Sequence, residues 1–396
     1  MTGQAAGATG ASGTADPAQE RELLEAIERW VQKEVAPRVM EYDHADRYPH
    51  ELVEQMKELG LFGATIAPEY GGLGLSASLY ARIVMHISSV WMAITGIFNS
   101  HLMLAYAIER FGTPSQKSQW LPRLATGELR GGLALTEPDA GTDLQGIRMT
   151  ARREGDSYVI NGTKIWISNG IEGSCFALLV KTDPQAQPRH RGMSLFIAPK
   201  QAGFSVGRKL DKLGYKCIDS AELIFRDYRV PAGHLIGEQE GQGFYQAGGG
   251  LALGRINVAA RGVGIAEGAL RMATEYAQTR QTFGKPICEH QSIQIKLADM
   301  VTRAHAARLL TLDAAEAFDR GERCDLQAGM AKYFASEAAL ENATESMRIH
   351  GAYGYSREFH VERLYRDAPL TCIGEGTNEM QRLIIARQWI KRNPLA

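Results

Sequence analysis

Cysteine is scarce in this chain and follows no recognisable pairing pattern. The 396 residues contain five cysteines, an odd number, and no CxxC motif. Their wide spacing excludes a disulfide framework and a cysteine zinc site, and it is typical of reduced thiols in a cytosol-like compartment. Because the chain also starts without the features of a presequence, we expect a cytoplasmic bacterial protein, with the mitochondrial matrix as the alternative. The cysteines are Cys175, Cys217, Cys288, Cys324 and Cys372.

An excess of charge of either sign is also missing. Lysine and arginine together number 44, aspartate and glutamate 45, and no block of like charge occurs. This balance gives no indication of a surface that binds nucleic acid or an anionic membrane.

Charge is absent altogether between Arg82 and Glu109. This stretch is long enough to span a bilayer, but it contains histidines, serines and an asparagine, with Gly96 in the middle. We interpret it as two buried helices, or one broken helix, in a large soluble core, in preference to a membrane span.

The remaining chain divides by composition and periodicity. Residues 1–16 are mostly Gly, Ala, Ser and Thr, which predicts a disordered tail without the features of a signal peptide or a presequence. Helical periodicity covers residues 17–130, alternation covers 131–240, and helical periodicity returns over 241–396. The expected fold class is therefore α+β, with an N-terminal helical domain, a middle β domain and a C-terminal helical bundle.

Several elements are predicted individually. Helices are expected over 17–40 and 51–59, and Thr113 and Pro114 suit the first positions of another helix. Residues 158–168 read as two strands around Asn161-Gly162, a strong hairpin signal. Further strands are expected at 176–181, 193–198 and 221–225, and the four bundle helices at 255–279, 293–320, 326–348 and 379–390.

Common catalytic motifs are missing as well. The chain contains no Walker loop, no HExxH and no GxSxG. Gly262-Val263-Gly264 is no dinucleotide fingerprint, because Glu267 stands where the third glycine should be. His360 and Glu362 are two residues apart, which is not the spacing of metal ligands on a helix.

What the chain does offer is a carboxylate in an unusual setting. Glu375 lies between two glycines, directly before the amphipathic segment 379–390, with Thr377 or Asn378 as a candidate N-cap. A helix dipole lowers the pKa of a nearby carboxyl group and burial raises it, so such a glutamate can act as a base near neutral pH. The alternative is an ordinary loop glutamate.

Four other segments have the composition of ligand contacts. Trp166 and Ser168 are two apart on a strand, so they share a face that suits a flat aromatic ligand. Residues 135–143 form a strand that ends in a polar turn, 280–284 place a cation beside an aromatic ring, and 351–355 allow close backbone approach. Each segment also has a purely structural interpretation. Trp166 could be a core residue, 135–143 an ordinary turn, 280–284 a solvated helix end and 351–355 a helix C-cap.

Taken together, these segments resemble the acyl-CoA dehydrogenase family over nearly all of the chain beyond the tail. The motifs that carry the resemblance are Leu-Thr-Glu-Pro-Asp-Ala-Gly-Thr-Asp at 135–143, Asn-Gly-Thr-Lys-Ile-Trp-Ile-Ser at 161–168, Arg-Gln-Thr-Phe-Gly-Lys-Pro-Ile at 280–287, His-Gln at 290–291, Gly-Ala-Tyr-Gly-Tyr at 351–355 and Gly-Glu-Gly-Thr-Asn-Glu at 374–379. The resemblance implies a middle β-barrel, FAD, an acyl-CoA substrate and a homotetramer. It also implies a role in fatty-acid β-oxidation, with an electron-transfer flavoprotein as the electron acceptor.

The resemblance also assigns residues by position, with Glu375 as the catalytic base. Those expected around the flavin ring are Leu133, Leu135, Thr136, Gly141, Thr142, Trp166, Ile167 and Ser168. Those expected to reach the FAD of a neighbouring subunit are Arg280, Gln281, Thr282, Phe283, His290 and Gln291. Those along the adenine half are Arg348, Ile349, Gly351 and Ala352, and those beside the pyrophosphate are Thr377, Asn378 and Glu379. Thr142, Arg255 and Gly376 are expected at the substrate.

The implied reaction is α,β-dehydrogenation of the acyl thioester to the trans-2-enoyl-CoA. Glu375 would remove the α-proton while the β-hydrogen leaves as hydride to the flavin, and hydrogen bonds to the thioester carbonyl would stabilise the developing enolate. Two alternatives stay open: an oxidase or monooxygenase on the same fold, and a non-catalytic scaffold. Because the uncharged stretch after Arg82 is the expected acyl pocket and contains no lysine or arginine, we expect a neutral acyl chain.

The chain departs from the common family pattern at a few positions. Along the adenine half, Arg348 stands where many members have glutamine, and His350 and Ala352 stand where leucine and glycine are common. Gly374 stands where a tyrosine is frequent. Thr142 replaces a frequent serine and keeps its hydroxyl. Gly374 is expected to leave a roomier substrate site.

Overall fold

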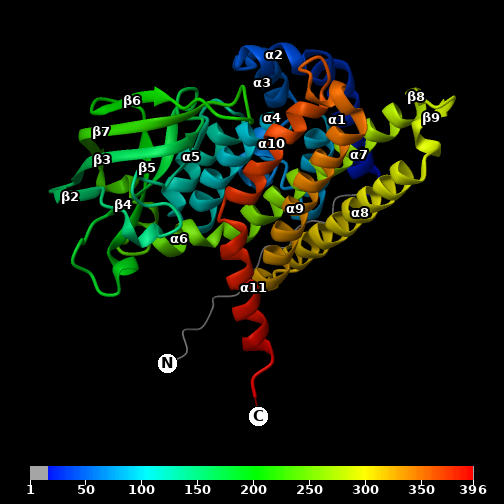
Figure 1. The fold of residues 1–396 in the computed structure, drawn as a ribbon. Coiled ribbons are helices and arrows are strands. Elements are labelled where there is room, and N and C mark those ends of the chain that lie inside the picture. The colour runs from blue at the N-terminus through cyan, green and yellow to red at the C-terminus, as the bar shows by residue number, and fades with distance from the viewer. Residues whose placement is uncertain (1–16, 396) are drawn as a thin grey trace.

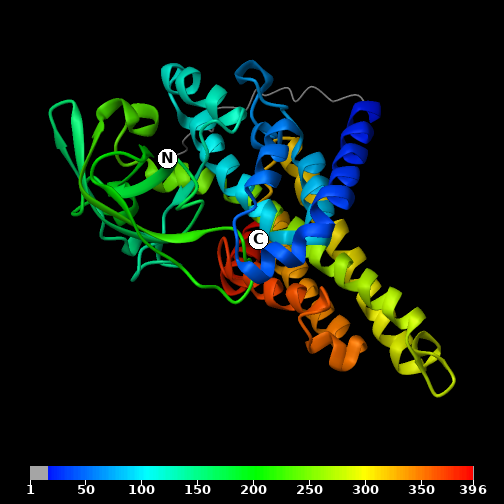
Figure 2. The ribbon, with the colours of Figure 1, turned by 90° about the horizontal axis from the view of Figure 1, so that it is seen from above.

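The computed structural model describes residues 17–395, and the tail predicted over 1–16 lies outside the described residues. Helices form the first and last parts of the described chain, and one β-sheet lies between them in sequence (Figure 1). Both views place the sheet on one side of the molecule, opposite the hairpin β8–β9 (Gln281–Thr282 and Lys285–Pro286) (Figure 2).

The first predicted helix is present but irregular. Helix α1 (Pro17–Trp30) continues through a π-helical turn (Val31–Val35) and a 3-10 turn (Ala36–Arg38) into α2 (Val39–Ala45). Pro37 explains the irregularity, because its ring nitrogen cannot donate the hydrogen bond of a regular helix.

Two other N-terminal helices follow their sequence signals. The predicted helix over 51–59 is α3 (His50–Glu58), and the left-handed Gly60 follows its end. Helix α5 (Pro114–Ala125) begins with a capping box between Thr113 and Gln116, as the residue types predicted.

The uncharged stretch forms the buried helix α4 (Ala77–Phe111). Its backbone departs from helical geometry at Trp91 (φ −153°, ψ 99°), so the prediction of a broken buried helix is confirmed. By length and composition alone α4 could cross a membrane, but 89% of its most apolar window is buried inside the protein. Gly96, in the middle of the stretch, is not the break; a side chain there would collide with the hydroxyl of Tyr215.

The middle of the chain forms one mixed sheet in the order β1-β4-β2-β3-β7-β6, with β5 also paired to β4. Alternate residues of β4 enter two different cores: Phe176, Leu178 and Val180 face a core within the sheet, while Cys175, Ala177 and Leu179 face the helices. Because one sheet encloses its own core, the sheet must be curled. Its two edge strands, β5 and β6, are not paired with each other among the described residues, so the sheet is open and does not close into a barrel. The strands are β1 (Gly131–Ala134), β2 (Thr150–Glu154), β3 (Ser157–Ser168), β4 (Cys175–Lys181), β5 (Met193–Pro199), β6 (Phe204–Lys209) and β7 (Ser220–Pro231).

The hairpin predicted at Asn161-Gly162 is wrong. Both residues lie inside the continuous strand β3, and the tight turn comes earlier, between Glu154 and Ser157. Gly162 is required for close packing instead, because a Cβ there would lie 2.6 Å from the side chain of Met149. The Asn161 side chain accepts a hydrogen bond from the backbone N–H of Asp227, opposite an irregularity in the pairing with β7.

The C-terminal part is helical, as predicted. Helices α7 (Leu251–Thr279), α8 (Gln291–Asp319) and α9 (Asp325–His350) pack against one another, and α10 (Val361–Ile373) packs against α9 and α7. Helix α10, which the periodicity did not single out, therefore takes the fourth place in the bundle.

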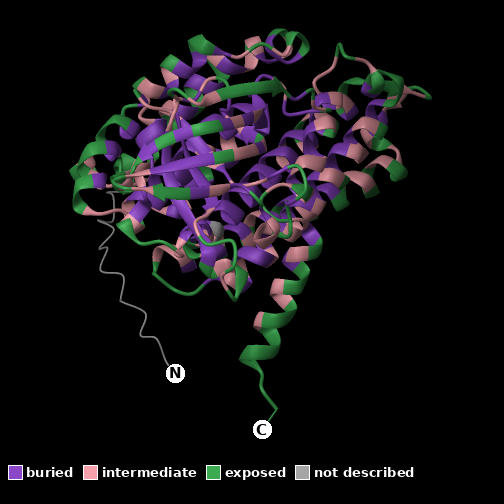
Figure 3. Ribbon diagram, turned by 90° about the vertical axis from the view of Figure 1, so that its left-hand side faces the viewer, coloured by how far each residue is buried: buried purple, intermediate pink, exposed green. Residues whose placement is uncertain are grey.

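Two further helices complete this part. The short helix α6 (Gly243–Gly249) precedes α7. The predicted helix over 379–390 is α11 (Asn378–Arg392), which contacts α9 and then projects from the body of the molecule (Figure 3). We keep the division into domains at 17–130, 131–240 and 241–396 as a proposal.

Candidate active site

Glu375 lies in a sharp connection between α10 and α11. Its backbone is left-handed (φ 53°), and so is that of Gly376 (φ 91°). A non-glycine residue rarely adopts this conformation, and functional sites are among the places where such strained residues cluster. Thr377 then caps α11 by accepting a hydrogen bond from the N–H of Met380 (3.4 Å), as predicted.

The Glu375 side chain points back into the protein between α4 and α7. Its Oε1 accepts a hydrogen bond from Nδ2 of Asn99 on α4 (3.1 Å). Its Oε2 lies against Gly254 of α7, where a Cβ would be only 2.3 Å away. Glycine at 254 therefore makes the room that the carboxylate occupies.

The electrostatic setting of Glu375 matches the one expected of a base. The residue as a whole is exposed, but its carboxylate end is turned toward α4 and α7, and desolvation there raises the pKa of Glu375 from its ordinary value. Arg261, the hydrogen bond from Asn99, and Lys332 act in the opposite direction. A carboxylate under these opposing influences can take up a proton from a weak carbon acid near neutral pH.

A buried lysine holds both ends of the loop that carries Glu375. The ammonium of Lys332 donates to the carbonyl oxygen of Cys372 (3.1 Å) and to Oδ1 of Asn378 (2.8 Å). Asn378 also accepts from Ser336 (3.0 Å) and donates to Glu337 (2.8 Å). The Asn378 side chain is therefore committed to internal contacts, so only its backbone is free for the predicted cofactor contact.

The residues predicted around a flavin ring lie on β1, the loop that follows it, and the end of β3. Trp166 is 58% exposed and sits in a bulge of β3 with a left-handed backbone (φ 63°). Ser168 is half-buried and Ile167, between them, is buried, so Trp166 and Ser168 share the accessible face. The N–H of Ile165 donates to the carbonyl of Thr136 (2.9 Å), which joins the two segments.

Helix α4 connects this surface to Glu375. Asn169, which follows β3, donates to the carbonyls of both Ile97 and Gly131 (2.8 Å each). Gly132 packs against Ser100, the neighbour of the Asn99 that binds Glu375. The carboxylate and the flavin-facing strands are therefore on either side of one turn of α4.

The other predicted residues of this surface differ in exposure. Leu133, Leu135 and Thr136 are half-buried, while Gly141 and Thr142 are exposed in the loop after β1.

A second group of predicted cofactor residues lies at the far end of the molecule. Arg280, Gln281 and Phe283 are exposed at the tip of the α7–α8 hairpin, and Phe283 is 96% exposed. Gln291, at the start of α8, is exposed as well. Thr282 and His290 are joined by a 3.0 Å hydrogen bond. Figures 1 and 2 both show this tip remote from the sheet, so one chain does not bring it to Trp166.

The segment after α9 belongs to this second group. The guanidinium of Arg280 lies 6.0 Å from the ring centroid of Tyr353, and His350 stacks on Tyr276 at 4.3 Å. Arg348, Gly351 and Ala352 are exposed, whereas Ile349 is buried. Ile349 and Ile167 therefore fill the core, and only their backbones are available to a cofactor.

The residues present fit FAD, the cofactor that the resemblance implies. An exposed indole beside the hydroxyls of Thr136 and Ser168 offers a stacking surface and hydrogen-bonding groups for a flat heteroaromatic ring. Arg280 and Arg348 offer cations to a pyrophosphate, at the end of the molecule remote from the sheet.

Of the predicted substrate residues, Arg255 is buried while Thr142 and Gly376 are exposed. The Arg255 guanidinium lies 3.5 Å from the carboxylate of Asp325, and burial lowers its pKa. Gly249 and Gly250, at the entry to α7, leave no free space, because Phe111 and Met103 pack against them. Glu379, expected beside the pyrophosphate, is exposed in the first turn of α11.

Sequence reasoning missed Asn99 as a partner of the base and did not anticipate Gly254, Arg261 or Lys332. Charged residues within apolar helices were the available signal for the last two. Other polar residues of α4 are internally satisfied: Thr95 donates to the carbonyl of Met92 (2.6 Å), and His101 contacts two backbone carbonyls (3.0 and 3.1 Å). Burial lowers the pKa of His101 to about 4, so this ring is neutral at physiological pH.

Two surface depressions of about 360 and 320 Å³ lie between α8 and α9. Arg303 and Glu345 line both, and Arg348 lines the second. Neither includes Glu375, so the chemistry is assigned from the carboxylate and its neighbours and not from the size of a depression.

Comparison with known proteins gives a consistent picture. A Bacillus subtilis protein described as "Acyl-CoA dehydrogenase" is 42% identical over 93% of this chain and 97% of its own length. The structure of butyryl-CoA dehydrogenase from Megasphaera elsdenii has a TM-score of 0.91 and 38% identity, and the match covers 94% of this chain and 98% of that one. A chain from a study of the "Electron transferring flavoprotein of Acidaminococcus fermentans" has a TM-score of 0.92 and 38% identity, covering 96% and 99%.

The family models match in the order of the fold. The N-terminal domain of acyl-CoA dehydrogenases matches residues 17–128, the middle domain 132–228 and the C-terminal domain 241–390. This chain therefore belongs to the acyl-CoA dehydrogenase family, whose members are FAD-dependent oxidoreductases.

Proposed function

We propose that this chain oxidises a short acyl-CoA thioester to the trans-2-enoyl-CoA, with Glu375 as the base that removes the α-proton. The observation that carries the proposal is the position of the Glu375 carboxylate. It is desolvated, it is held by Asn99 and fitted against Gly254, and it lies one turn of α4 away from the strand that presents Trp166.

The residues of this chain divide the work of the reaction. Glu375 takes the proton from the carbon beside the thioester carbonyl, and the loop held by Lys332 keeps the carboxylate in place. The buried faces of α4 and α7, which are apolar apart from a few polar side chains beside Glu375, exclude water from the acyl chain. FAD, when bound, supplies the acceptor for the hydride from the β-carbon.

Similarity supports the choice of substrate and electron acceptor. The likeness to butyryl-CoA dehydrogenase favours a short acyl group, and the likeness to the chain from the electron-transferring-flavoprotein study favours such a flavoprotein as acceptor. A place in β-oxidation follows from the same substrate class.

A homo-oligomer, specifically a tetramer, is part of the proposal. The second group of cofactor residues is remote from Trp166 within one chain, so a neighbouring copy would have to supply it. Helices α8 and α11 also leave large apolar side chains exposed, which suits contact between copies. These side chains are Ile295, Val301, Leu309, Leu383, Trp389 and Ile390.

We also propose a cytoplasmic location in a bacterial cell. Its support is that all five cysteines are free thiols, which suits a reducing compartment. Fractionation that recovers the protein outside the cytoplasm would contradict this part.

The reaction is tested by anaerobic bleaching of the bound flavin. Purified wild type and Glu375→Gln are mixed with butyryl-CoA and with longer and branched acyl-CoAs. We expect wild type to bleach and Glu375→Gln to bleach about 10²- to 10⁴-fold more slowly, because only the base is lost. Glu58→Gln, at the exposed end of α3 and with no expected contact to cofactor or substrate, serves as the matched control and should bleach like wild type.

Three outcomes would contradict the proposal. Equal bleaching of wild type and Glu375→Gln would show that another group is the base. Reoxidation that is faster with oxygen than with an electron-transfer flavoprotein would favour an oxidase. A single-chain mass in light scattering of the active holoenzyme would exclude the oligomer.

A further inference from the structure

A buried polar cluster extends from Glu375 into the core between α4 and α7. Asn99, which donates to Glu375, accepts a hydrogen bond from the hydroxyl of Tyr80 (3.3 Å). That hydroxyl accepts from Nδ2 of Asn257 (3.0 Å). Arg261, one turn further along α7, donates to the hydroxyl of Tyr215 (3.1 Å). We call Tyr80, Asn99, Tyr215, Asn257 and Arg261 the polar cluster.

These side chains occupy the wall along which an acyl chain would extend from the base. Gly254, Asn257 and Arg261 are three, then four, residues apart, so they share one face of α7. Gly254 contacts the Glu375 carboxylate, and the helical rise places the Cα atoms of Asn257 and Arg261 about 4.5 and 10.5 Å further along. On α4, Asn99 and Gly96 are one turn apart, and Gly96 makes room for the Tyr215 hydroxyl.

Arg261 is the member of the cluster that forms no ion pair, although its charge favours the ionised form of Glu375 from a distance. Its residue is 6% exposed, and its Nε has no hydrogen-bond partner. Within residues 17–395 no carboxylate lies within ion-pair distance of its guanidinium. Burying an unpaired guanidinium costs several kcal/mol in general, so such a group is rarely kept without an anionic partner.

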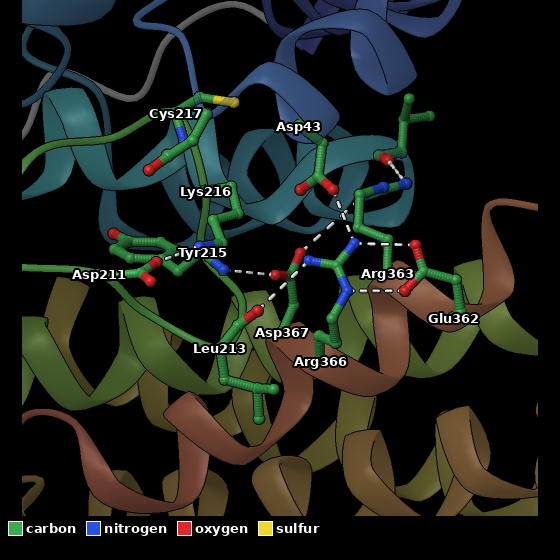
Figure 4. Close-up of polar contacts among 12 residues, drawn as sticks. Asp43, Asp211, Leu213, Tyr215, Lys216, Cys217, Glu362, Arg363, Arg366 and Asp367 are labelled. Carbon is green, nitrogen blue, oxygen red and sulfur yellow. Dashed lines mark hydrogen bonds and ion pairs between the residues drawn. The ribbon is translucent and has the colours of Figure 1, made fainter. Parts of the chain in front are cut away.

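The partner hydroxyl of Arg261 is rigidly placed. The backbone N–H of Tyr215 donates to the buried carboxylate of Asp367 on α10 (2.6 Å), as Figure 4 shows. The neighbouring Arg366 is bound by the carboxylates of Asp43 (2.6 Å) and Glu362 (2.6 Å). This network fixes the loop that presents Tyr215, so Arg261 and Tyr215 together form a prearranged pair of donors.

We propose that Arg261, assisted by Tyr215, binds a carboxylate at the far end of a short acyl chain, so that the substrate is a CoA monothioester of a short dicarboxylic acid. A guanidinium and a phenol offer several N–H and O–H donors, which match the two oxygens of a carboxylate. The inference rests on the proposed function, because it assigns the far end of the same substrate site. The reaction itself is unchanged: the α-proton goes to Glu375, the β-hydrogen leaves as hydride to the oxidised flavin, and no bond to the distal carboxylate forms or breaks.

This inference replaces the expectation of a neutral acyl chain. That expectation followed from the lack of lysine and arginine between Arg82 and Glu109. In this proposal the cation comes from α7 instead, where Arg261 shares a helix face with the Gly254 that contacts Glu375.

Binding is measured separately from turnover. Holoenzyme carrying Glu375→Gln is titrated calorimetrically with glutaryl-CoA and with pentanoyl-CoA, which have the same number of acyl carbons. We expect glutaryl-CoA to bind more tightly. Adding Arg261→Gln should weaken glutaryl-CoA about 10- to 100-fold, the usual range for a hydrogen bond to a charged group, and leave pentanoyl-CoA within about threefold.

Three further variants make the result specific. Tyr215→Phe should weaken glutaryl-CoA only, and by less than Arg261→Gln. Arg261→Lys keeps the charge and should restore part of the binding, which also covers the case in which Arg261→Gln folds poorly. Arg271→Gln, an exposed arginine on the same helix, should change neither affinity.

The failures are distinguishable. If wild-type flavin is bleached by pentanoyl-CoA but not by glutaryl-CoA, or if pentanoyl-CoA binds as tightly, the proposed function stands and the dicarboxylate inference is wrong. If Arg261→Gln weakens both ligands equally, Arg261 serves the base or the fold and not the distal carboxylate. If no acyl-CoA bleaches the flavin, the proposed function itself fails.

Discussion

The ammonium of Lys332 lies 2.8 Å from Oδ1 of Asn378, and the same ammonium reaches the carbonyl of Cys372 at 3.1 Å. One buried cation thus joins the end of α10 to the start of α11, and Glu375 lies on the short loop between them. The base is therefore positioned by a residue on α9, through its contacts with both ends of the loop.

Replacing this cation should disturb the base more than substrate binding. We expect Lys332→Met to lower kcat about 10- to 100-fold, because the carboxylate loses its fixed position, with a much smaller change in the affinity for acyl-CoA. The charge of Lys332 also lowers the pKa of Glu375, so the acidic limb of the pH profile of kcat should move to higher pH. Lys391→Met, on the exposed end of α11, is the control and should leave the profile unchanged. An unshifted profile in Lys332→Met would refute the positioning role.

Gly254 should tolerate no side chain without loss of activity. A methyl group there would lie 2.3 Å from Oε2 of Glu375 and would push the carboxylate out of place. We expect Gly254→Ala to lower kcat at least tenfold while the melting temperature stays near that of wild type, since alanine favours a helix over glycine by about 1 kcal/mol. Gly233→Ala, at a position with no atom within 4 Å, is the comparison. Equal kcat in the two variants would show that Glu375 does not depend on this contact.

The buried ion pair beneath the flavin-facing strands should be a strong determinant of stability. Lys164 of β3 is fully buried and donates to Glu137 (2.9 Å) and to the carbonyl of Leu135 (2.8 Å). Lys164→Met leaves Glu137 buried without its cation, so urea unfolding should show a loss of about 3–5 kcal/mol in the free energy of unfolding. Arg152→Met, which breaks an exposed pair on β2, should cost no more than about 1 kcal/mol. Similar losses in both variants would contradict the assignment.

Glu375 should also give stability a defined pH dependence. Burial raises its pKa, so the folded protein holds the proton above pH 4.5 where the unfolded chain releases it. The unfolding free energy contributed by this group is therefore highest below pH 4.5 and falls as pH rises through the folded pKa. Glu375→Gln removes this effect, so its melting temperature should rise relative to wild type between pH 4.5 and pH 8.

Glu379, whose pKa is shifted in the opposite direction, provides the control. The pKa of Glu379 is lowered, chiefly by hydrogen bonds at the start of α11, so the stability it contributes is present above pH 4.5 and is lost as pH falls. Glu379→Gln should therefore be less stable than wild type by an amount that stays constant above pH 4.5 and shrinks as the pH falls below 4.5. A parallel response of the two variants would refute the sign worked out for Glu375.

Sequence patterns predicted the secondary structure well where residues close in the chain determine it. The residue types at Thr113 were sufficient to predict the start of α5, because a helix cap depends on residues close in sequence. The uncharged run was likewise sufficient to predict the buried helix α4. Asn161-Gly162 misled for the same reason: a glycine selected for close packing on Met149 has the same local appearance as one selected for a turn. Only the three-dimensional neighbour separates the two.

The candidate site shows a similar limit. Glu375 was found from its two glycines and the helix that follows. Asn99 and Arg261 were not assigned, because their roles depend on which faces of α4 and α7 meet around the carboxylate. The sequence shows a buried arginine in an apolar helix, but not the absence of a carboxylate beside it.

The remoteness of Arg280 and Phe283 from Trp166 has a genetic consequence. Consider an assembly in which the hairpin tip of one chain completes the site of another. A chain mutated at Glu375 then lacks the base but still offers an intact hairpin tip, and a chain mutated at Arg280 lacks the tip but keeps the base. Mixed oligomers of the two would contain some sites with both intact halves. Two inactive alleles expressed together would then restore measurable activity that neither provides alone.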